Sequence, residues 1–289
     1  MIIVQLKGGF GNQLFQYAAA LNLGKYHNVS VKVDISLLNI PDALIGTTRA
    51  FDLLSIQHSI EVASEAEVNA VKGNKLIQHL QRFLPPYKRN IYKEVSFNYD
   101  QHFLEARNNI YLKGYRQSEK YFELITNEIK KTFFIKEELI KDVSNVAFQI
   151  QSENSVSIHI RRGDYTNAKM LEYHGIQGIE YYIQALSFIK EKISNPKFFI
   201  FSDNINWVRE NLNLNEEAHL ISVDESPTSI TDFHLMNCCK HNIIANSTFS
   251  WWAAYLNPNP DKIIIAPKRW FNKANYDTKD LIPSSWIQL

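Results

Sequence analysis

The sequence is poor in cysteine, has no long apolar run and carries no excess of one charge, and each absence excludes a class of protein. Its two cysteines, Cys238 and Cys239, are neighbours, which suits neither a disulfide nor a spaced set of metal ligands. No apolar run reaches the length of a membrane span, and the apolar start at Met1 is interrupted too soon for a signal peptide. Lys and Arg total 31 against 30 Asp and Glu, so a nucleic-acid partner is not indicated. We expect a cytoplasmic protein with core thiols and at most peripheral attachment to the inner face of a membrane.

The chain of 289 residues is long enough for two α/β domains of ordinary size. The first opens with an apolar strand at 2–6, a glycine turn, a helix over 12–26 and a strand at 29–33. A polar link at 151–154 marks the boundary, so we predict domains at 1–152 and 153–289. Further elements expected in the first domain are a short helix at 64–71, a strand at 110–113 and helices at 118–134 and 137–150.

The second domain alternates strands with helices. Such alternation implies a parallel sheet with right-handed crossovers, so the whole chain is predicted to be α/β with two Rossmann-like lobes. We expect strands at 156–160, 197–201, 219–223, 242–245 and 262–266, and helices at 179–193, 204–212, 230–240 and 248–256.

The segment Ser-Ile-His-Ile-Arg-Arg-Gly-Asp-Tyr begins as a buried strand and ends in charged residues. Ligands of open α/β sheets bind beyond the carboxyl ends of the strands. Alternation along the strand places His159 and Arg161 on one side and Arg162 on the other. Two neighbouring guanidinium groups suit a phosphate or diphosphate. The alternative is a salt-bridged surface turn in which Asp164 neutralises one arginine.

The turn after the first strand, Gly-Gly-Phe-Gly-Asn-Gln, supplies backbone N–H groups at a helix N-terminus, where an anion can bind. Together with Asp34 it nearly completes a dinucleotide-binding fingerprint, but Leu14 stands at the third glycine. Asn12 either contributes its amide to a ligand or caps the helix.

Two other predicted strands end in polar residues. Asp203 follows one of them, and Asn246, Ser247 and Thr248 follow another, where Ser247 or Thr248 could cap the next helix. The pair Trp251-Trp252 lies inside that helix among alanines, so core packing is expected for at least one of the two rings.

Taken together, these motifs resemble the α-1,2-fucosyltransferases of glycosyltransferase family 11. The matching stretches are 8–13, 159–165 and 247–252, in the same order and at similar spacing. The resemblance implies a GT-B-like architecture and an inverting transfer of L-fucose from GDP-fucose to a galactose-terminated glycan. It is weakest over 36–100, as expected of an insertion on the acceptor side, and this region includes the basic, aromatic-rich stretch 72–93.

The arginine motif is also similar to that of α-1,6- and protein O-fucosyltransferases. The resemblance implies that Arg161 binds the β-phosphate with Arg162 beside it, and that His159 contacts the guanosine. It places Asp232 against the edge of guanine, where a carboxylate can accept hydrogen bonds from N1–H and N2–H₂ together. Asp232 could instead complement a helix dipole. The remaining donor-binding residues carried over are Gly9, Gly11, Asn12, Asp203, Asn246, Ser247, Thr248, Phe249 and Ser250.

No Asp-x-Asp occurs in the sequence, so no metal cofactor is expected and the arginines would stabilise the leaving diphosphate. A single displacement needs at most one base at the galactose 2-hydroxyl. Asp164 is the first candidate and Glu172 the second, with His174 also in the same loop. His174 and Tyr165 are expected to contact the acceptor.

Two other functions compete with this interpretation. An oxidoreductase of the NAD type would use the glycine loop and Asp34 but leaves the arginine pair unexplained. A non-catalytic carbohydrate-binding protein would use the many aromatic side chains as stacking platforms, but it also makes no use of the arginines.

Overall fold

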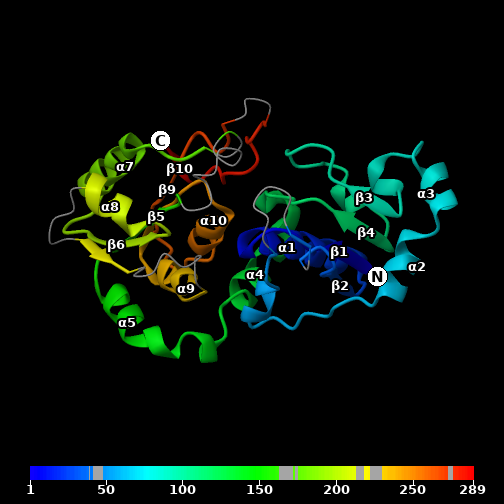
Figure 1. The fold of residues 1–289 in the computed structure, drawn as a ribbon, viewed down its shortest axis with the longest axis horizontal. Helices are drawn as coiled ribbons and strands as arrows, with labels where there is room; N and C mark the ends of the chain where they lie inside the picture. The colour runs from blue at the N-terminus through cyan, green and yellow to red at the C-terminus, as the bar shows by residue number, and fades with distance from the viewer. Residues whose placement is uncertain are drawn as a thin grey trace. The chain divides into compact units, whose positions relative to one another are not determined.

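The computed structural model is an α/β chain that divides into two compact units (Figure 1). Unit 1 comprises Met1–Thr132 and Asp277–Pro283, and unit 2 comprises Phe133–Tyr276 and Ser284–Leu289. The predicted division at 152/153 lies farther along the chain, and the return of 277–283 to unit 1 was not predicted. The structure describes residues 1–38, 40–41, 48–162, 172, 175–212, 218–221, 230–272 and 276–289.

Unit 1 is built on a four-stranded parallel sheet with the order β2-β1-β4-β3. Ile2 of β1 pairs with Val31 of β2 and with Ile110 of β4, so the first strand is central. Helix α1 (Phe10–His27) forms the crossover connection from β1 to the parallel strand β2, and it buries Leu14 and Phe15. The strands are β1 (Ile2–Gln5), β2 (Val31–Asp34), β3 (Ile91–Lys93) and β4 (Ile110–Lys113); of these, only the short β3 was not predicted.

The remaining helices of unit 1 are short. Helix α2 (Glu65–Lys72) starts with a capping box, because the Ser64 hydroxyl accepts from the Glu67 N–H and the Glu67 carboxylate accepts from the Ser64 N–H. The helix predicted over 118–134 is instead a 3₁₀ segment, Glu119–Ile125, with non-helical backbone at Phe122, followed by α4 (Thr126–Thr132). Helix α3 (Lys75–Gln81) was not predicted.

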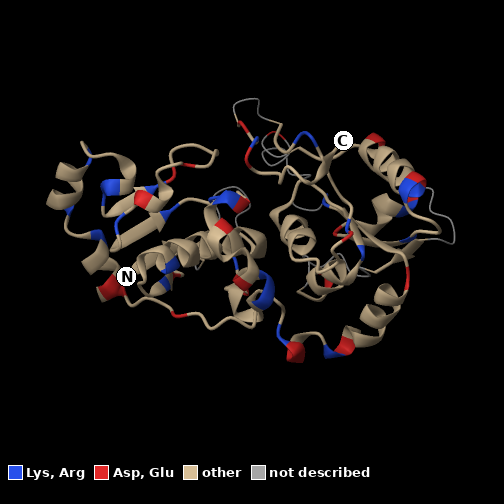
Figure 2. Cartoon of the chain, turned by 180° about the vertical axis from the view of Figure 1, so that it is seen from behind, with Lys and Arg blue, Asp and Glu red and all other residues tan. Residues whose placement is uncertain are grey.

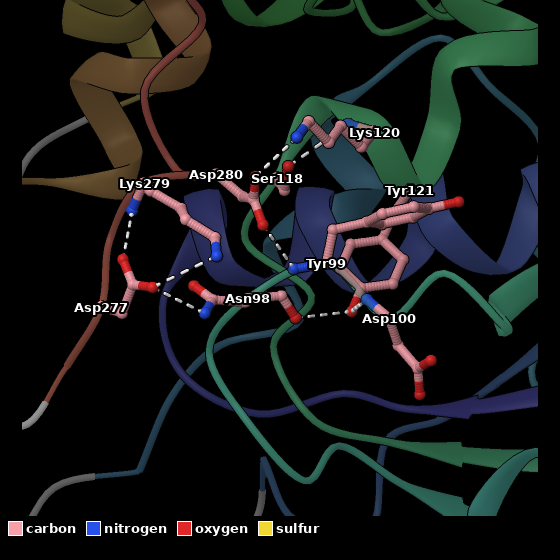
Figure 3. A network of polar contacts seen from close by, with 9 residues as sticks. All are labelled: Asn98, Tyr99, Asp100, Ser118, Lys120, Tyr121, Asp277, Lys279 and Asp280. Carbon is pink, nitrogen blue, oxygen red and sulfur yellow. Dashed lines mark hydrogen bonds and ion pairs between the residues drawn. The ribbon is translucent and has the colours of Figure 1, made fainter.

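The C-terminal segment 277–283 is fastened to the loop that follows β3 (Figure 3). The Asn98 amide donates to Asp277 Oδ2 at 2.9 Å, and the Tyr99 N–H donates to Asp280 Oδ2 at 3.0 Å. Lys120 Nζ forms an ion pair with Asp280 Oδ1 at 2.6 Å. Because the Asp280 side chain is largely buried, its carboxylate depends on these donors, which hold this late segment of the chain in unit 1.

Unit 2 contains a six-stranded parallel sheet with the order β10-β9-β8-β5-β6-β7. The strand order runs outward from β5 in one direction and then from β8 in the other, which is the doubly wound Rossmann order. All strands stay parallel, and the point at which the order of strand addition reverses lies between β5 and β8. The strands are β5 (Ser155–Ile160), β6 (Lys197–Ser202), β7 (Ala218–Leu220), β8 (His241–Ile243), β9 (Ile264–Ala266) and β10 (Ile287–Gln288).

The apolar side of β5 forms the core of unit 2. Val156, Ile158 and Ile160 pack with Tyr181 of α7 and Val208 of α8. The helices described in unit 2 are α5 (Ser144–Ser152), α7 (Ile179–Lys192), α8 (Ile205–Asn211), α9 (Ile230–Cys238) and α10 (Thr248–Tyr255). The helix expected at 137–150 begins later, at Ser144, after two 3₁₀ turns.

Core positions were expected in unit 2 for at least one of Trp251 and Trp252 and for the two thiols. Trp251 and Trp252 are both fully buried, which confirms the predicted core role. Cys239 is also buried, and Cys238 is half-buried with a free thiol. Within the described part of the chain, no helix is both long and apolar enough to pass through a bilayer.

Candidate active site at the carboxyl edge of the unit 2 sheet

The arginine motif ends strand β5 at the point where the strand order of unit 2 reverses. Ile160 pairs with Ser202 of β6, so the next residues along the two strands are Arg161 and Asp203. On the other side Ile158 pairs with Ile243 of β8, so the same register leads to Asn246. The predicted residues therefore meet at the edge where doubly wound sheets bind ligands.

Asp203 holds the arginine pair in place. Its Oδ2 lies 2.9 Å from Arg161 Nη1, and its Oδ1 accepts from the Arg162 N–H at 2.7 Å. The Arg161 side chain is 13% exposed and that of Asp203 is 5% exposed, so this ion pair is largely withdrawn from water. A guanidinium held in this way is oriented before any ligand arrives.

The Arg162 side chain lies on the other face of the sheet, as the alternation along β5 predicts. Its guanidinium carbon is 4.0 Å from the centre of the Trp207 ring, in the first turn of α8. Burial lowers the pKa of Arg162, although the group keeps its charge at neutral pH. Trp207 was not predicted as part of the site; its place four residues after Asp203 was the only signal in the sequence.

His159 lies beneath the arginines and is completely buried. Its ring packs against Phe249 with 5.9 Å between centroids, and neither ring nitrogen has a hydrogen-bond partner among the described residues. Burial, and secondly the charge of Arg161, lower the pKa of His159 to about 3. The imidazole is therefore neutral at physiological pH and can offer one donor and one acceptor.

Helices α9 and α10 bring two further predicted residues to the His159 side of the sheet. Phe233 of α9 packs against Phe249 of α10 with 5.4 Å between centroids, and Phe249 contacts His159. Asp232 precedes Phe233 in the first turn of α9 and is partly buried. This position fits both the guanine contact and the helix-dipole alternative.

The start of α10 differs from the expected capping. Ser247 occupies the N-cap position, but its side chain makes no capping hydrogen bond, and Thr248 is the first helical residue. The Ser250 hydroxyl donates to the Ser247 carbonyl at 3.3 Å. The Asn246 amide donates to the carbonyls of Trp270 (3.0 Å) and Gly175 (3.3 Å), so part of its role is to fix the neighbouring loops.

In unit 1 the glycine loop connects β1 to α1. Gly8 has a φ of +78°, and an added Cβ would lie 2.6 Å from the Asn12 amide nitrogen, so glycine is required here. Gly9 is the N-cap residue of α1, a Cβ on it would meet no atom within 4 Å, and Gly11 is buried in the first turn. Asn12 does not cap the helix: its Oδ1 accepts from Gln117 Nε2 at 2.6 Å. Gln117, which follows β4, was not predicted.

Asp34 does not offer a free carboxylate for a ribose. The Tyr111 hydroxyl donates to one oxygen, and the Ser36 N–H donates to the other at 2.9 Å. Lys72 lies 4.0 Å away, and the Asp34 side chain is buried. Because both oxygens are engaged within unit 1, the acidic residue of the dinucleotide fingerprint has a structural role here.

A cavity of about 280 Å³ lies in unit 1 beside the loop after β3, next to the network in Figure 3. It combines aromatic rings with carboxylates and amides, which are groups that bind sugars by stacking and by hydrogen bonds to hydroxyls. Its volume lies just below the usual range of about 300–1,000 Å³ for small-molecule sites. The lining residues are Tyr92, Glu94, Val95, Ser96, Asn98, Tyr99, Asp100, Gln101, His102, Arg116 and Tyr121.

Three predicted residues, Asp164, Tyr165 and His174, lie outside the residues that the structure describes. Glu172 is described and its side chain is exposed. No three His, Cys, Asp or Glu side chains of the described ranges are grouped so that they could hold a metal ion, and metal independence stays a prediction.

Comparison with known proteins identifies the family. The family model for glycosyl transferase family 11 matches residues 1–289. The chain belongs to this family. Two Escherichia coli relatives in the comparison are each 31% identical: an alpha-1,2-colitosyltransferase, aligned over 100% of this chain and 99% of its own, and the O-antigen biosynthesis glycosyltransferase WbnK, over 98% and 99%. A galactoside alpha-(1,2)-fucosyltransferase 1 of Bos taurus is 27% identical over 86% of this chain and 64% of its own.

Two solved structures share the fold of this family 11 chain at low sequence identity. NodZ alpha-1,6-fucosyltransferase soaked with GDP-fucose is 13% identical, with a TM-score of 0.52 over 89% of this chain and 92% of its own. POFUT1 in complex with GDP-fucose is also 13% identical, with a TM-score of 0.50 over 91% and 97%. The predicted GT-B-like architecture of two α/β lobes is thereby confirmed.

The burial of neutral His159 predicts how stability changes with pH. The unfolded side chain has a pKa near 6.5 and the folded one about 3, so below pH 6.5 only the unfolded state gains the proton. As the pH is lowered from about 6 to about 4, protonation of this side chain in the unfolded state should reduce the free energy of unfolding by roughly 1.4 kcal/mol per pH unit. Urea unfolding of the wild type and of His159→Leu across this range measures the difference. If the free energy of unfolding has the same slope with pH in both proteins, His159 is not a neutral imidazole in the folded state.

Proposed function

We propose that the chain is an inverting α-1,2-fucosyltransferase that moves L-fucose from GDP-fucose to the 2-hydroxyl of a terminal galactose. The observation that carries the proposal is the Arg161–Asp203 ion pair beside Arg162 at the reversal point of the unit 2 sheet. The names of the Bos taurus relative and of the GDP-fucose complexes support the choice of donor and linkage. The residues of unit 1 proposed to contact the donor remain Gly9, Gly11 and Asn12.

Arg161 is proposed to stabilise the leaving diphosphate. In the reaction the galactose O2 forms a bond to the anomeric carbon of fucose while the bond from that carbon to the phosphate oxygen breaks. Negative charge grows on the diphosphate, and a guanidinium already oriented by Asp203 meets it without reorganisation. The galactose proton would pass to a base in the loop after β5, for which Asp164, Glu172 and His174 remain the candidates.

The guanosine is proposed to bind on the His159 side of the sheet. The buried rings of Phe233, Phe249 and His159 give this side an apolar floor, and Asp232 directly precedes Phe233 in the first turn of α9. A carboxylate there can accept from N1–H and N2–H₂ of guanine together. Uracil and adenine lack this pair of donors, which would make the site selective for GDP.

A second candidate activity is transfer of colitose, which is L-fucose without its 3-hydroxyl group. The 31% identical alpha-1,2-colitosyltransferase favours it. The two donors can be separated because discrimination is asymmetric. A site that hydrogen-bonds a hydroxyl rejects the deoxy analogue by about 10⁴–10⁵, whereas an apolar site rejects the added hydroxyl only weakly, by about 10².

Transfer assays with GDP-fucose and GDP-colitose on a β-galactoside acceptor test the activity itself. We expect kcat/KM for GDP-fucose to exceed that for GDP-colitose by several orders of magnitude. We also expect product formation to survive EDTA, since the arginines would supply the positive charge. A preference for GDP-colitose would mean that the donor is GDP-colitose and not GDP-fucose. Loss of activity in EDTA with rescue by Mg²⁺ or Mn²⁺ would rule out the metal-free mechanism.

Replacing Asp232 by alanine tests guanine selection. The loss of its acceptor oxygens should weaken GDP binding by about 1–3 kcal/mol, because the guanine donors would be left unpaired. Isothermal titration with GDP and with UDP measures the effect, and UDP binding should not change. The thermal midpoint of the ligand-free variant is the control for folding. Unchanged GDP affinity would assign Asp232 to the helix dipole alone.

The variants Arg161→Lys and Arg162→Lys form a matched pair for the leaving-group role. Lysine keeps the charge of Arg161 but loses the planar fork, so kcat should drop about 100-fold while the KM for GDP-fucose changes much less. Arg162→Lys should be milder, because that guanidinium lies over Trp207 on the opposite face of the sheet. Near-normal turnover in Arg161→Lys would mean that Arg161 does not stabilise the leaving group and that the motif is only a salt-bridged turn.

A further inference from the structure

Helix α3 of unit 1 presents its apolar side chains to solvent. None of its residues is buried, and Leu76 and Leu80 are 67% and 61% exposed. Phe83, just beyond the helix, is 77% exposed. At about 100° per residue Leu76, Ile77 and Leu80 lie on one side of the helix. Phe83 and Leu84, which are also exposed, follow directly after the C-cap residue Arg82. We call these five exposed apolar side chains the stripe.

The polar side of the same helix faces the body of unit 1. The Gln78 amide donates to the Gly73 carbonyl at 2.9 Å. The Gln81 amide donates to Asn90 Oδ1 at 2.9 Å, and its carbonyl oxygen accepts from the Asn90 N–H at 2.8 Å, just before β3. A surface helix normally turns its apolar side to the core, so α3 is attached in the reverse orientation.

Both ends of α3 are held, so the exposed stripe is not the result of a frayed segment. At the N-terminus the Asn74 side chain accepts from the Ile77 N–H. At the other end Arg89 donates through Nε to the Leu84 carbonyl and through Nη2 to the Arg82 carbonyl. These bonds hold the backbone on either side of Leu80 and Phe83.

The surroundings of the stripe are strongly basic, although the formal net charge of the whole chain is only +1. From Val68 to Lys93 the sequence contains six Lys and Arg and no Asp or Glu. Lys75, Arg82 and Lys88 are exposed, and Figure 2 shows basic but no acidic residues on α3. The Arg82 guanidinium lies 4.9 Å from the centre of the Phe83 ring, so charge and apolar surface adjoin.

We propose that α3 and the segment up to Arg89 form a docking surface for an anionic lipid bilayer. Apolar side chains on one side of a fixed helix with Lys and Arg beside them are the features of helices that lie in the membrane interface. Leu76, Leu80 and Phe83 would enter the boundary between headgroups and acyl chains. The neighbouring cations would contact the lipid phosphates, and their attraction would weaken with salt. This inference does not depend on the transferase activity.

Co-sedimentation of the full chain with lipid vesicles tests the proposal. We expect binding to vesicles containing one quarter phosphatidylglycerol, weak binding to pure phosphatidylcholine, and a marked decrease at 0.5 M NaCl. Leu80→Ser with Phe83→Ser should lower the partition coefficient at least tenfold. Phe148→Ser is the matched control, because Phe148 is 75% exposed on α5 of unit 2 and should not affect binding.

A second pair separates the contribution of charge. Lys75→Gln with Lys88→Gln should lower binding to the anionic vesicles, whereas Lys131→Gln with Lys141→Gln, at exposed lysines outside the basic stretch, should not. Circular dichroism verifies folding of each variant. The proposal is overturned if both vesicle types bind the protein equally or if the Leu80 and Phe83 changes have no effect. It is also overturned if those changes convert a dimer into a monomer in analytical ultracentrifugation while vesicles are not bound, since the stripe would then be a contact between two copies.

Discussion

The position of β5 between β6 and β8 is the constraint on which the candidate active site depends. Parallel pairing fixes the register, so the residues after Ile160 and Ser202 must lie side by side, and these are Arg161 and Asp203. Because side chains alternate along the strand, Arg162 lies on the α8 side, where its guanidinium packs over the Trp207 ring. A slip of one residue would exchange the faces and place both arginines among the wrong neighbours.

Burial sets the chemical character of this site. The Arg161 guanidinium and the Asp203 carboxylate are both largely removed from water, which is costly for each charge unless the other remains beside it. The same low exposure keeps His159 neutral and makes the arginines stronger partners for an anion than they would be in water. A diphosphate is the type of ligand that such a fixed positive charge favours, in agreement with membership of glycosyl transferase family 11.

The two units use related geometry for different purposes. In unit 1 the strand order also reverses beside the first strand, and the Asn12–Gln117 bond joins the first turn of α1 to the residues after β4. There the polar groups are largely committed to each other, as Asp34 is to Tyr111 and Ser36. Unit 1 also carries the reversed helix α3, a surface that the core of the unit does not need and that is explained by an external partner.

The sequence by itself determined the class of fold and the order of most strands and helices, because hydrophobic periodicity and turn residues are local signals. It also determined the family, through three motifs, and the division of His159, Arg161 and Arg162 between two faces of a strand. Tertiary structure decided which distant residues meet in the site: the candidate Asp203 and the unpredicted Trp207 reach the arginines only through strand pairing and crossover helices. Gln117, also unpredicted, reaches Asn12 across more than a hundred residues. Tertiary structure also decided that the kinked segment around Phe122 is not one helix, that 277–283 returns to unit 1 and that α3 turns its apolar side outward, since packing against remote parts of the chain overrides local pattern.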